Sequence, residues 1–191
     1  MNFFILGSQR CGTTWIHELL VRLGVDLPIH KQTYYFDRYP KNGLVWYLSC
    51  FSKISGATLK GEVATGYCLK DAFGRLNQVF PKGKLVLVVR HPIDRSYSNY
   101  SKRFSEYQGK SFPEALNTDF DLLERSLYGE MIENISNLDR STDLLILFYE
   151  DLQKDAFGFA KQIINHIRIN VTDAELKKSL PGIVNSSRYS R

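Results

Sequence analysis

The sequence has few cysteines and no long apolar run, and both absences narrow the classes of protein that it can encode. The three cysteines, Cys11, Cys50 and Cys68, are odd in number and show no C-x-x-C spacing. They argue against a disulfide framework and a zinc site, and they favour a reducing compartment. No apolar stretch approaches the ~20 residues that span a bilayer, and the first residues lack a secretory-signal pattern. We therefore expect a cytoplasmic location and no membrane span.

Charge of either sign is not concentrated anywhere in the chain. The net charge of +5 suits an anionic ligand or an acidic partner. However, there is no run of Lys and Arg and no nucleic-acid-binding motif, so we do not expect a nucleic-acid partner. The sequence also lacks internal repeats, low-complexity tracts and linkers. We therefore predict one domain over residues 1–191, with residues 182–191 as a flexible tail. The oligomeric state is not readable from the sequence.

Short apolar runs alternate with amphipathic stretches along the chain, a pattern typical of an α/β protein. We expect strands at residues 3–7, 58–63, 84–90 and 143–149. We expect helices at residues 13–23, 41–52, 69–80, 92–106, 112–125, 127–138 and 155–167. Alternating strands and helices predict a parallel β-sheet flanked by helices on both faces.

Residues 3–14, FFILGSQRCGTT, carry the most specific local signal. An apolar strand is followed by a turn with two glycines, Gly7 and Gly12, and then by a helix that begins near Thr13. This geometry directs backbone N–H groups and a helix N-terminus at one point, which predicts an anion site, usually for phosphate. The glycines have the Walker A spacing, but Thr13 stands where the Walker lysine belongs. The positive charge lies inside the loop, at Arg10, which disfavours an ATPase or GTPase.

A second polar segment follows the apolar run at residues 84–89. Arg90 ends that predicted strand, and open α/β sheets bind ligands at the carboxyl ends of their strands. Pro92 suits the first turn of the next helix, which carries Arg95, Ser98, Lys102 and Arg103. We expect these side chains near the same edge of the sheet as the glycine turn.

Together the two segments resemble the cofactor motifs of sulfotransferases that use 3′-phosphoadenosine 5′-phosphosulfate (PAPS). GSQRCGTT at residues 7–14 is similar to the loop that holds the 5′-phosphosulfate, and RHPIDRSYS at residues 90–98 is similar to the 3′-phosphate motif. Weaker similarities, to heparan-sulfate-type and bacterial members, occur at residues 30–51, 61–67 and 144–152. The resemblance implies a P-loop-like topology, PAPS as sulfuryl donor, adenosine 3′,5′-bisphosphate (PAP) as product, and no metal.

The resemblance also assigns roles to residues. Arg10 and nearby backbone N–H groups would stabilise the leaving phosphate, and Arg90 and Ser98 would bind the 3′-phosphate. The short C-terminus would make the protein a minimal member of the family, or it would reduce the lid over the 3′-phosphate to Arg188 and Arg191. The full set of predicted cofactor-binding residues is Gln9, Arg10, Cys11, Gly12, Thr13, Thr14, Trp15, Arg90, Ser98 and Arg188.

The sequence departs from the family at the position of the general base. Gln32 occupies the position of the Glu that takes the acceptor's proton in heparan-sulfate-type members, and an amide is no useful base. His30 and Glu62 are the alternative candidates, with Asp37 a further carboxylate nearby. Alternatively, the acceptor needs little assistance from a base and Gln32 only orients it, or the protein binds PAPS without transferring sulfate. The predicted catalytic set is therefore Arg10, His30, Gln32 and Glu62.

The acceptor is not identified by the sequence. We expect a hydroxyl or amine on a small molecule or a glycan. An aromatic cluster suits either a wall of the acceptor pocket or the core, and it comprises Tyr34, Tyr35, Phe36, Tyr39, Trp46 and Tyr47. Two other functions stay open, namely a small-molecule kinase with a P-loop-like fold and a catalytically silent PAPS- or PAP-binding protein.

Overall fold

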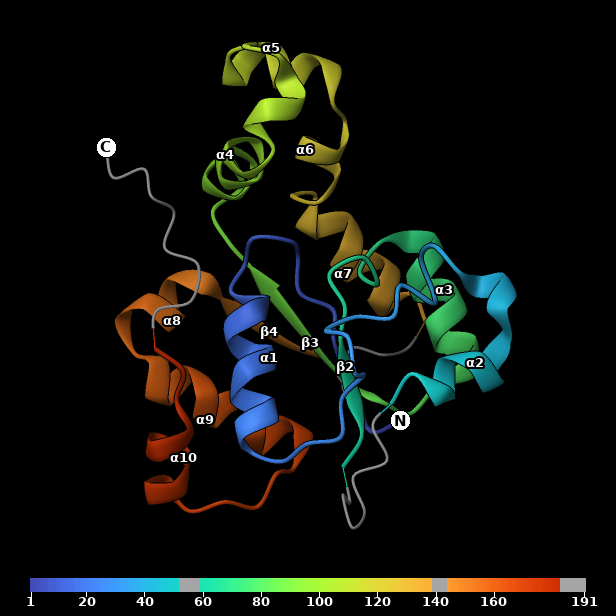
Figure 1. Cartoon of the computed structure of the whole chain (residues 1–191), viewed down its shortest axis with the longest axis vertical. Helices are drawn as coiled ribbons and strands as arrows, with labels where there is room; N and C mark the ends of the chain where they lie inside the picture. The colour runs from blue at the N-terminus through green and yellow to red at the C-terminus, as the bar shows by residue number, and fades with distance from the viewer. Residues whose placement is uncertain (52–58, 139–143, 183–191) are drawn as a thin grey trace.

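A computed structural model of the protein describes residues 1–51, 59–138 and 144–182. Its centre is a parallel sheet with the strand order β2-β1-β3-β4 (Figure 1). The strands are β1 (Phe3–Ile5), β2 (Gly61–Val63), β3 (Lys84–Val89) and β4 (Leu144–Phe148). Helices cover both faces, so the α/β class and the parallel sheet are confirmed.

The strand order places β1 in the interior of the sheet, between β2 and β3. Phe3 is in register with Gly61 on one side and with Lys84 on the other. The chain leaves β1 through α1 (Thr13–Arg22) to reach β2, then returns through α3 (Lys70–Val79) to β3 on the opposite side of β1. Successive connections therefore lead to opposite sides of β1. In open α/β sheets, ligands bind beside such a switch point, at the carboxyl ends of the strands.

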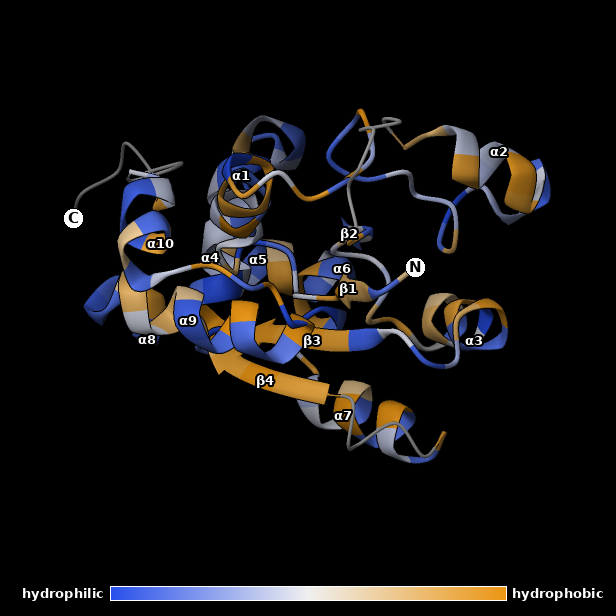
Figure 2. Cartoon of the chain, turned by 90° about the horizontal axis from the view of Figure 1, so that it is seen from below, coloured by the Kyte–Doolittle hydropathy of each residue, from blue (hydrophilic) through white to orange (hydrophobic). Residues whose placement is uncertain are grey.

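Alternate residues of each strand supply two separate hydrophobic cores. Phe3 and Ile5 of β1 pack in the core under α1 and α9 (Ala156–Ile167), whereas Phe4 packs in the core under α3 and α7 (Tyr128–Ser136). Residues of β3 alternate in the same way, and Figure 2 shows β3 and β4 as strongly hydrophobic strands between the helical layers. Near-continuous apolar runs such as LVLVV reflect burial on both faces.

The remaining helices complete the two layers and form a lobe beyond the carboxyl edge. The described part of the chain contains η1 (Pro40–Asn42), α2 (Gly43–Ser49), α4 (Pro92–Lys102), η2 (Phe104–Tyr107), α5 (Phe112–Thr118), α6 (Asp121–Glu124), α8 (Tyr149–Lys154) and α10 (Asp173–Ser179). Helices α4, α5 and α6 project together from the sheet edge (Figure 1). The lobe has a small core of its own, in which Tyr100, Tyr107, Ala115 and Leu122 are buried.

Several expected boundaries are wrong. The helix expected at residues 112–125 is two short helices, α5 and α6, and the helix expected at 92–106 ends at Lys102 before a 3₁₀ turn. Helix α8, which follows β4 directly, and helix α10 were not expected. A capping box begins α10, because Thr172 and Glu175 each accept a hydrogen bond from the other's backbone N–H.

Candidate functional site

The glycine turn lies at the carboxyl ends of β1 and β3. The backbone N–H of Ser8 still donates to the Val88 carbonyl (3.1 Å), after which the chain turns sharply into α1. Arg10 (φ 72°) and Gly12 (φ 78°) are both left-handed. At Gly12 a Cβ atom would come within 2.9 Å of the Leu152 side chain, so a larger residue would be both strained and crowded there.

This turn leaves a set of backbone donors without acceptors. Within the described part of the chain, no backbone N–H of residues 9–15 donates a hydrogen bond to the protein, and Gly12 caps α1 without a side-chain oxygen. Unpaired N–H groups at a helix N-terminus that is preceded by left-handed residues form an anion-binding concavity. The structure thus brings the predicted residues Gln9 to Thr14 together around one point.

Arg10 connects the glycine turn to the second predicted motif. Its Nε donates to Ser98 Oγ (3.0 Å) on α4. Arg90, which follows β3, donates from Nη1 to the Arg10 carbonyl oxygen (3.2 Å). The guanidinium of Arg90 also stacks on Tyr149, with 4.7 Å between its central carbon and the ring centroid. Arg10, Arg90 and Ser98 therefore share one edge of the sheet, as the sequence predicts.

The sequence did not single out Lys31 as a site residue, yet its side chain reaches the glycine turn. The Lys31 ammonium donates to Thr14 Oγ1 (2.9 Å) and to Thr13 Oγ1 (3.3 Å). The loop that carries Lys31 runs past α1, where the helix begins. The structure thus supplies a cation at the N-terminus of α1 from outside the glycine turn.

Three cations, Arg10, Lys31 and Arg90, crowd this edge without a counter-ion from the described residues. Burial and the neighbouring Arg90 lower the pKa of Arg10. Burial and the neighbouring Arg10 lower the pKa of Lys31 to about 8. Because neighbouring positive charges disfavour one another's charged forms, an anion at this edge would be stabilising.

Two other basic residues, Arg95 of α4 and Arg103 directly after it, hold the lobe together. Arg95 is wholly buried and donates to the carbonyl of Leu122, which ties α4 to α6. Arg103 forms ion pairs with Glu106 (2.8 Å) and Asp119 (2.8 Å) inside the lobe. Both residues stabilise the lobe, and Arg95 also acts electrostatically on Cys11 of the glycine turn.

Two candidates for the general base, His30 and Gln32, lie in the loop at residues 30–37, and the third, Glu62, lies on β2. His30 is exposed beside Lys31, whereas Glu62 on β2 is wholly buried. The Glu62 carboxylate accepts from the Thr33 backbone N–H (2.6 Å) and from the Tyr47 (3.0 Å) and Tyr67 (3.3 Å) hydroxyls. Burial raises the pKa of Glu62 to about 7, although these hydrogen bonds oppose the shift. This geometry favours Glu62 as an anchor of the loop over Glu62 as a base.

Gln32 is likewise held by neighbouring groups. Its Oε1 accepts from the Thr65 backbone N–H (3.2 Å), and its Nε2 donates to the Tyr34 hydroxyl (2.6 Å). An amide fixed at both ends can orient an acceptor but cannot take its proton. The assignment of the base therefore remains a prediction.

Two of the predicted cofactor-binding residues have buried side chains. Trp15 is buried, and its indole N–H donates to the Pro181 carbonyl (3.1 Å), so its ring faces the core. Cys11 is also buried, and burial raises the pKa of its thiol to about 12, which keeps it protonated. Arg188 lies outside the described residues, as does the predicted tail apart from Gly182.

Half of the aromatic cluster is buried in the core. Tyr35, Phe36 and Tyr47 are buried, and Tyr35 stacks on Tyr47 with 4.9 Å between ring centroids. Tyr39 is half exposed at the edge of the cluster. These rings shape the loop at residues 30–37 from beneath rather than lining an open pocket.

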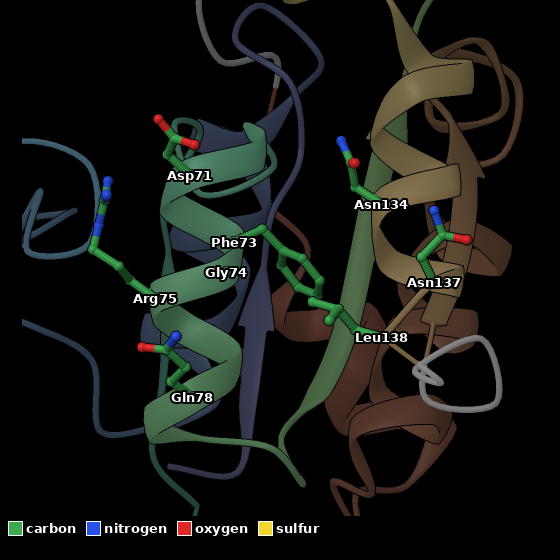
Figure 3. A pocket seen from close by; sticks show the side chains of 8 residues that line it. All are labelled: Asp71, Phe73, Gly74, Arg75, Gln78, Asn134, Asn137 and Leu138. Carbon is green, nitrogen blue, oxygen red and sulfur yellow. The ribbon is translucent and has the colours of Figure 1, made fainter.

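A groove of about 480 Å³ between α3 and α7 lies away from this edge. Figure 3 shows Phe73 and Leu138 approaching one another across it, with Asp71, Asn134 and Asn137 around its rim. It has no cluster of cations and does not include the carboxyl ends of the strands. Across the described ranges, no group of three metal-ligating side chains occurs, and no helix is long and apolar enough to cross a membrane.

Solved structures with the same fold include a sulfotransferase from Alicyclobacillus acidocaldarius. It is 18% identical, with a TM-score of 0.78 over 88% of this chain and 81% of that one. Mouse sulfotransferase SULT7A1, crystallised with PAP, is 17% identical, with a TM-score of 0.65 over 93% of this chain and 61% of that one. At such identities the likeness shows the fold, and it confirms the P-loop-like topology.

Curated relatives match the sequence itself. Human heparan sulfate glucosamine 3-O-sulfotransferase 6 is 31% identical over 107 residues, which cover 55% of this chain and 31% of the relative. The membrane-associated sulfotransferase kil1 of Dictyostelium discoideum is 27% identical over 141 residues, 67% of this chain and 30% of the relative. The chain thus spans about a third of the length of these relatives. The family model of the sulfotransferase domain matches residues 1–184, and the chain therefore belongs to the sulfotransferase domain family.

Proposed function

We propose that the protein transfers a sulfuryl group from PAPS to a hydroxyl or amine acceptor. The observation that carries the proposal is the shared edge on which Arg10, Arg90 and Ser98 meet beside the glycine turn. Two linked anion sites at one switch point suit a nucleotide with phosphate groups on both its 5′ and 3′ oxygens. Family membership and the PAP-bound structural neighbours support this cofactor.

In this proposal the glycine turn holds the 5′-phosphosulfate and the second motif holds the 3′-phosphate. The free N–H groups of residues 11–14 point at the 5′ end and stabilise negative charge without rearrangement. Arg90 presents a planar fork of donors to the 3′-phosphate, with its guanidinium held against Tyr149. Ser98 lies beside it on α4 and adds a hydroxyl.

The reaction is an in-line transfer that resembles phosphoryl transfer. A lone pair of the acceptor oxygen or nitrogen attacks sulfur, and the bond between sulfur and the bridging oxygen breaks. The bonding electrons remain on the 5′-phosphate of PAP, while the acceptor's proton passes to a base. His30 is the exposed candidate for that base, and a small molecule or glycan is the proposed acceptor class.

The test is transfer from PAPS labelled with radioactive sulfur to a panel of alcohols, sugars and amines. Label should appear on at least one acceptor, and Arg90→Ala should lose most of the signal at low donor concentration. Binding of PAP without transfer to any acceptor would instead support a silent binding protein. Transfer of phosphate from ATP to any of the acceptors would support the kinase alternative.

A further inference from the structure

Helix α2 is hydrophobic on the side that faces away from the core as well as on the side that faces it. Tyr47 is wholly buried, whereas Leu44, Val45 and Leu48 on the opposite side of the helix are exposed. Val45 alone has 84% of its surface exposed. A helix that is hydrophobic all round is normally buried, so the outer side of α2 is expected to have a partner.

Two side chains from outside the helix extend this apolar surface. Ile29 is 72% exposed, and its backbone N–H donates to the Cys50 carbonyl oxygen (2.9 Å) at the end of α2. Tyr39 is half exposed, and its ring packs edge-on against Trp46, with 6.4 Å between ring centroids. Figure 2 shows α2 and its hydrophobic segments at the periphery of the molecule. The α2 patch is defined by Ile29, Tyr39, Leu44, Val45 and Leu48.

The charges around the α2 patch are positive. Arg38 and Lys41 are exposed beside it, as is His30. Neither Arg38 nor Lys41 forms an ion pair within the described part of the chain. Asp37 is the only acidic residue among residues 27–61, and its Oδ1 is buried. Exposed cations therefore flank an exposed apolar surface that has little negative charge nearby.

We propose that the α2 patch docks the protein on the surface of a lipid bilayer that contains anionic lipid. The apolar side chains enter the boundary between head groups and acyl chains, and the flanking cations face the lipid phosphates and carboxylates. Tyr39 contributes an amphipathic ring of the kind that favours the head-group level. Docking of this kind needs no membrane-spanning helix, and it does not depend on the proposed function.

Two features favour a bilayer over another protein as the partner. Four of the five side chains of the patch are aliphatic, whereas the dominant residues of protein interfaces are enriched in Trp, Tyr and Arg, and Leu and Val are under-represented among them. A second copy of the chain, related by a two-fold axis, would bring the patch against itself and its cations close to like charges. An anionic bilayer attracts the same cations.

The α2 patch is continuous with the loop that reaches the candidate site. His30 and Lys31 follow Ile29 directly, and the Lys31 ammonium donates to Thr14 Oγ1 (2.9 Å) at the start of α1. Docking through Ile29 therefore brings this end of the candidate site close to the bilayer.

The experiment is sedimentation of the protein with vesicles of equimolar phosphatidylserine and phosphatidylcholine, and with vesicles of phosphatidylcholine alone. The wild type should bind the anionic vesicles about 5-fold or more tightly than the neutral ones, and added salt should weaken this preference. Ile29→Ser and Val45→Ser should each weaken binding to anionic vesicles about 10-fold, because an apolar side chain no longer enters the lipid. Ile93→Ser is the matched control, because Ile93 is 63% exposed on α4, and it should bind as the wild type does.

A second pair of variants isolates the contribution of charge. Lys41→Gln should weaken binding to anionic vesicles about 5-fold and leave binding to neutral vesicles unchanged. Lys110→Gln, at an exposed position in the lobe, is its control and should match the wild type. Equal binding by Ile29→Ser, Val45→Ser and Ile93→Ser, or wild-type protein that sediments with neither kind of vesicle, would overturn the proposal. A wild-type dimer in analytical ultracentrifugation that Val45→Ser converts to monomers would also overturn it, because a second copy would then cover the patch.

Discussion

Replacing Glu62 with glutamine should make folding stability less dependent on pH between 4.5 and 7. Burial raises the pKa of Glu62 from its ordinary value of 4.5 to about 7 in the folded protein. Between these values the folded state keeps a proton that the unfolded chain releases. The stabilising contribution is therefore fully present below pH 4.5 and is lost as pH rises through 7.

The magnitude follows from the difference between the two pKa values. A difference of about 2.5 corresponds to roughly 3 kcal/mol, at about 1.4 kcal/mol per pKa unit. Glu62→Gln keeps the shape of the side chain and does not titrate. Its amide oxygen can still accept from Thr33, and its amide nitrogen can donate to the Tyr47 hydroxyl. The variant should therefore gain about 3 kcal/mol relative to wild type between pH 4.5 and pH 8.

Urea unfolding across this pH range measures the difference directly. Glu130→Gln is a matched control, because Glu130 is exposed on α7, and its curve should follow the wild-type curve. Parallel curves for Glu62→Gln and wild type would refute the reasoning from burial. The same variant also tests whether Glu62 acts in catalysis. Retained sulfuryl transfer would identify Glu62 as an anchor of the loop, and a loss of 100-fold or more would identify it as the general base.

Three further predictions concern the site and its support. Arg90→Ala should raise the Kd for PAP by about 10- to 100-fold, since a hydrogen bond to a charged group contributes about 1.5–3 kcal/mol; titration calorimetry measures it, and an unchanged Kd would remove Arg90 from the site. Gly12→Ala should weaken PAP binding or unfold the protein, because the residue is left-handed and a Cβ would meet Leu152; wild-type affinity in a folded variant would contradict this. Trp15→Phe should lose about 1–3 kcal/mol of stability, because the Pro181 carbonyl loses its buried donor; equal urea midpoints would contradict this.

The elements that the sequence predicts best are those with strong local signals. The glycine turn, the apolar run of β3 and Arg90 at its end all follow from composition and spacing over a few residues. Their meeting at one edge follows from parallel pairing, because the carboxyl ends of parallel strands lie together. Helix α10 was missed although Thr172 and Glu175 form a recognisable capping box.

The roles of Lys31 and Glu62 could not be predicted from local sequence. Lys31 reaches α1 only because the loop after it is anchored on Glu62, and that contact joins residues 29 positions apart. The burial of Glu62 depends on the aromatic core around Tyr47 and Tyr67, which no short window of sequence contains. Similarly, the direction of the Arg10 side chain depends on where α4 places Ser98, 88 positions away.

The most direct test of the account is calorimetric titration of the protein with PAP and, separately, with ATP. The account predicts that PAP binds at least tenfold more tightly, because only PAP carries a phosphate for Arg90 and Ser98 as well as one for the glycine turn. Affinity for ATP equal to or greater than that for PAP would contradict it.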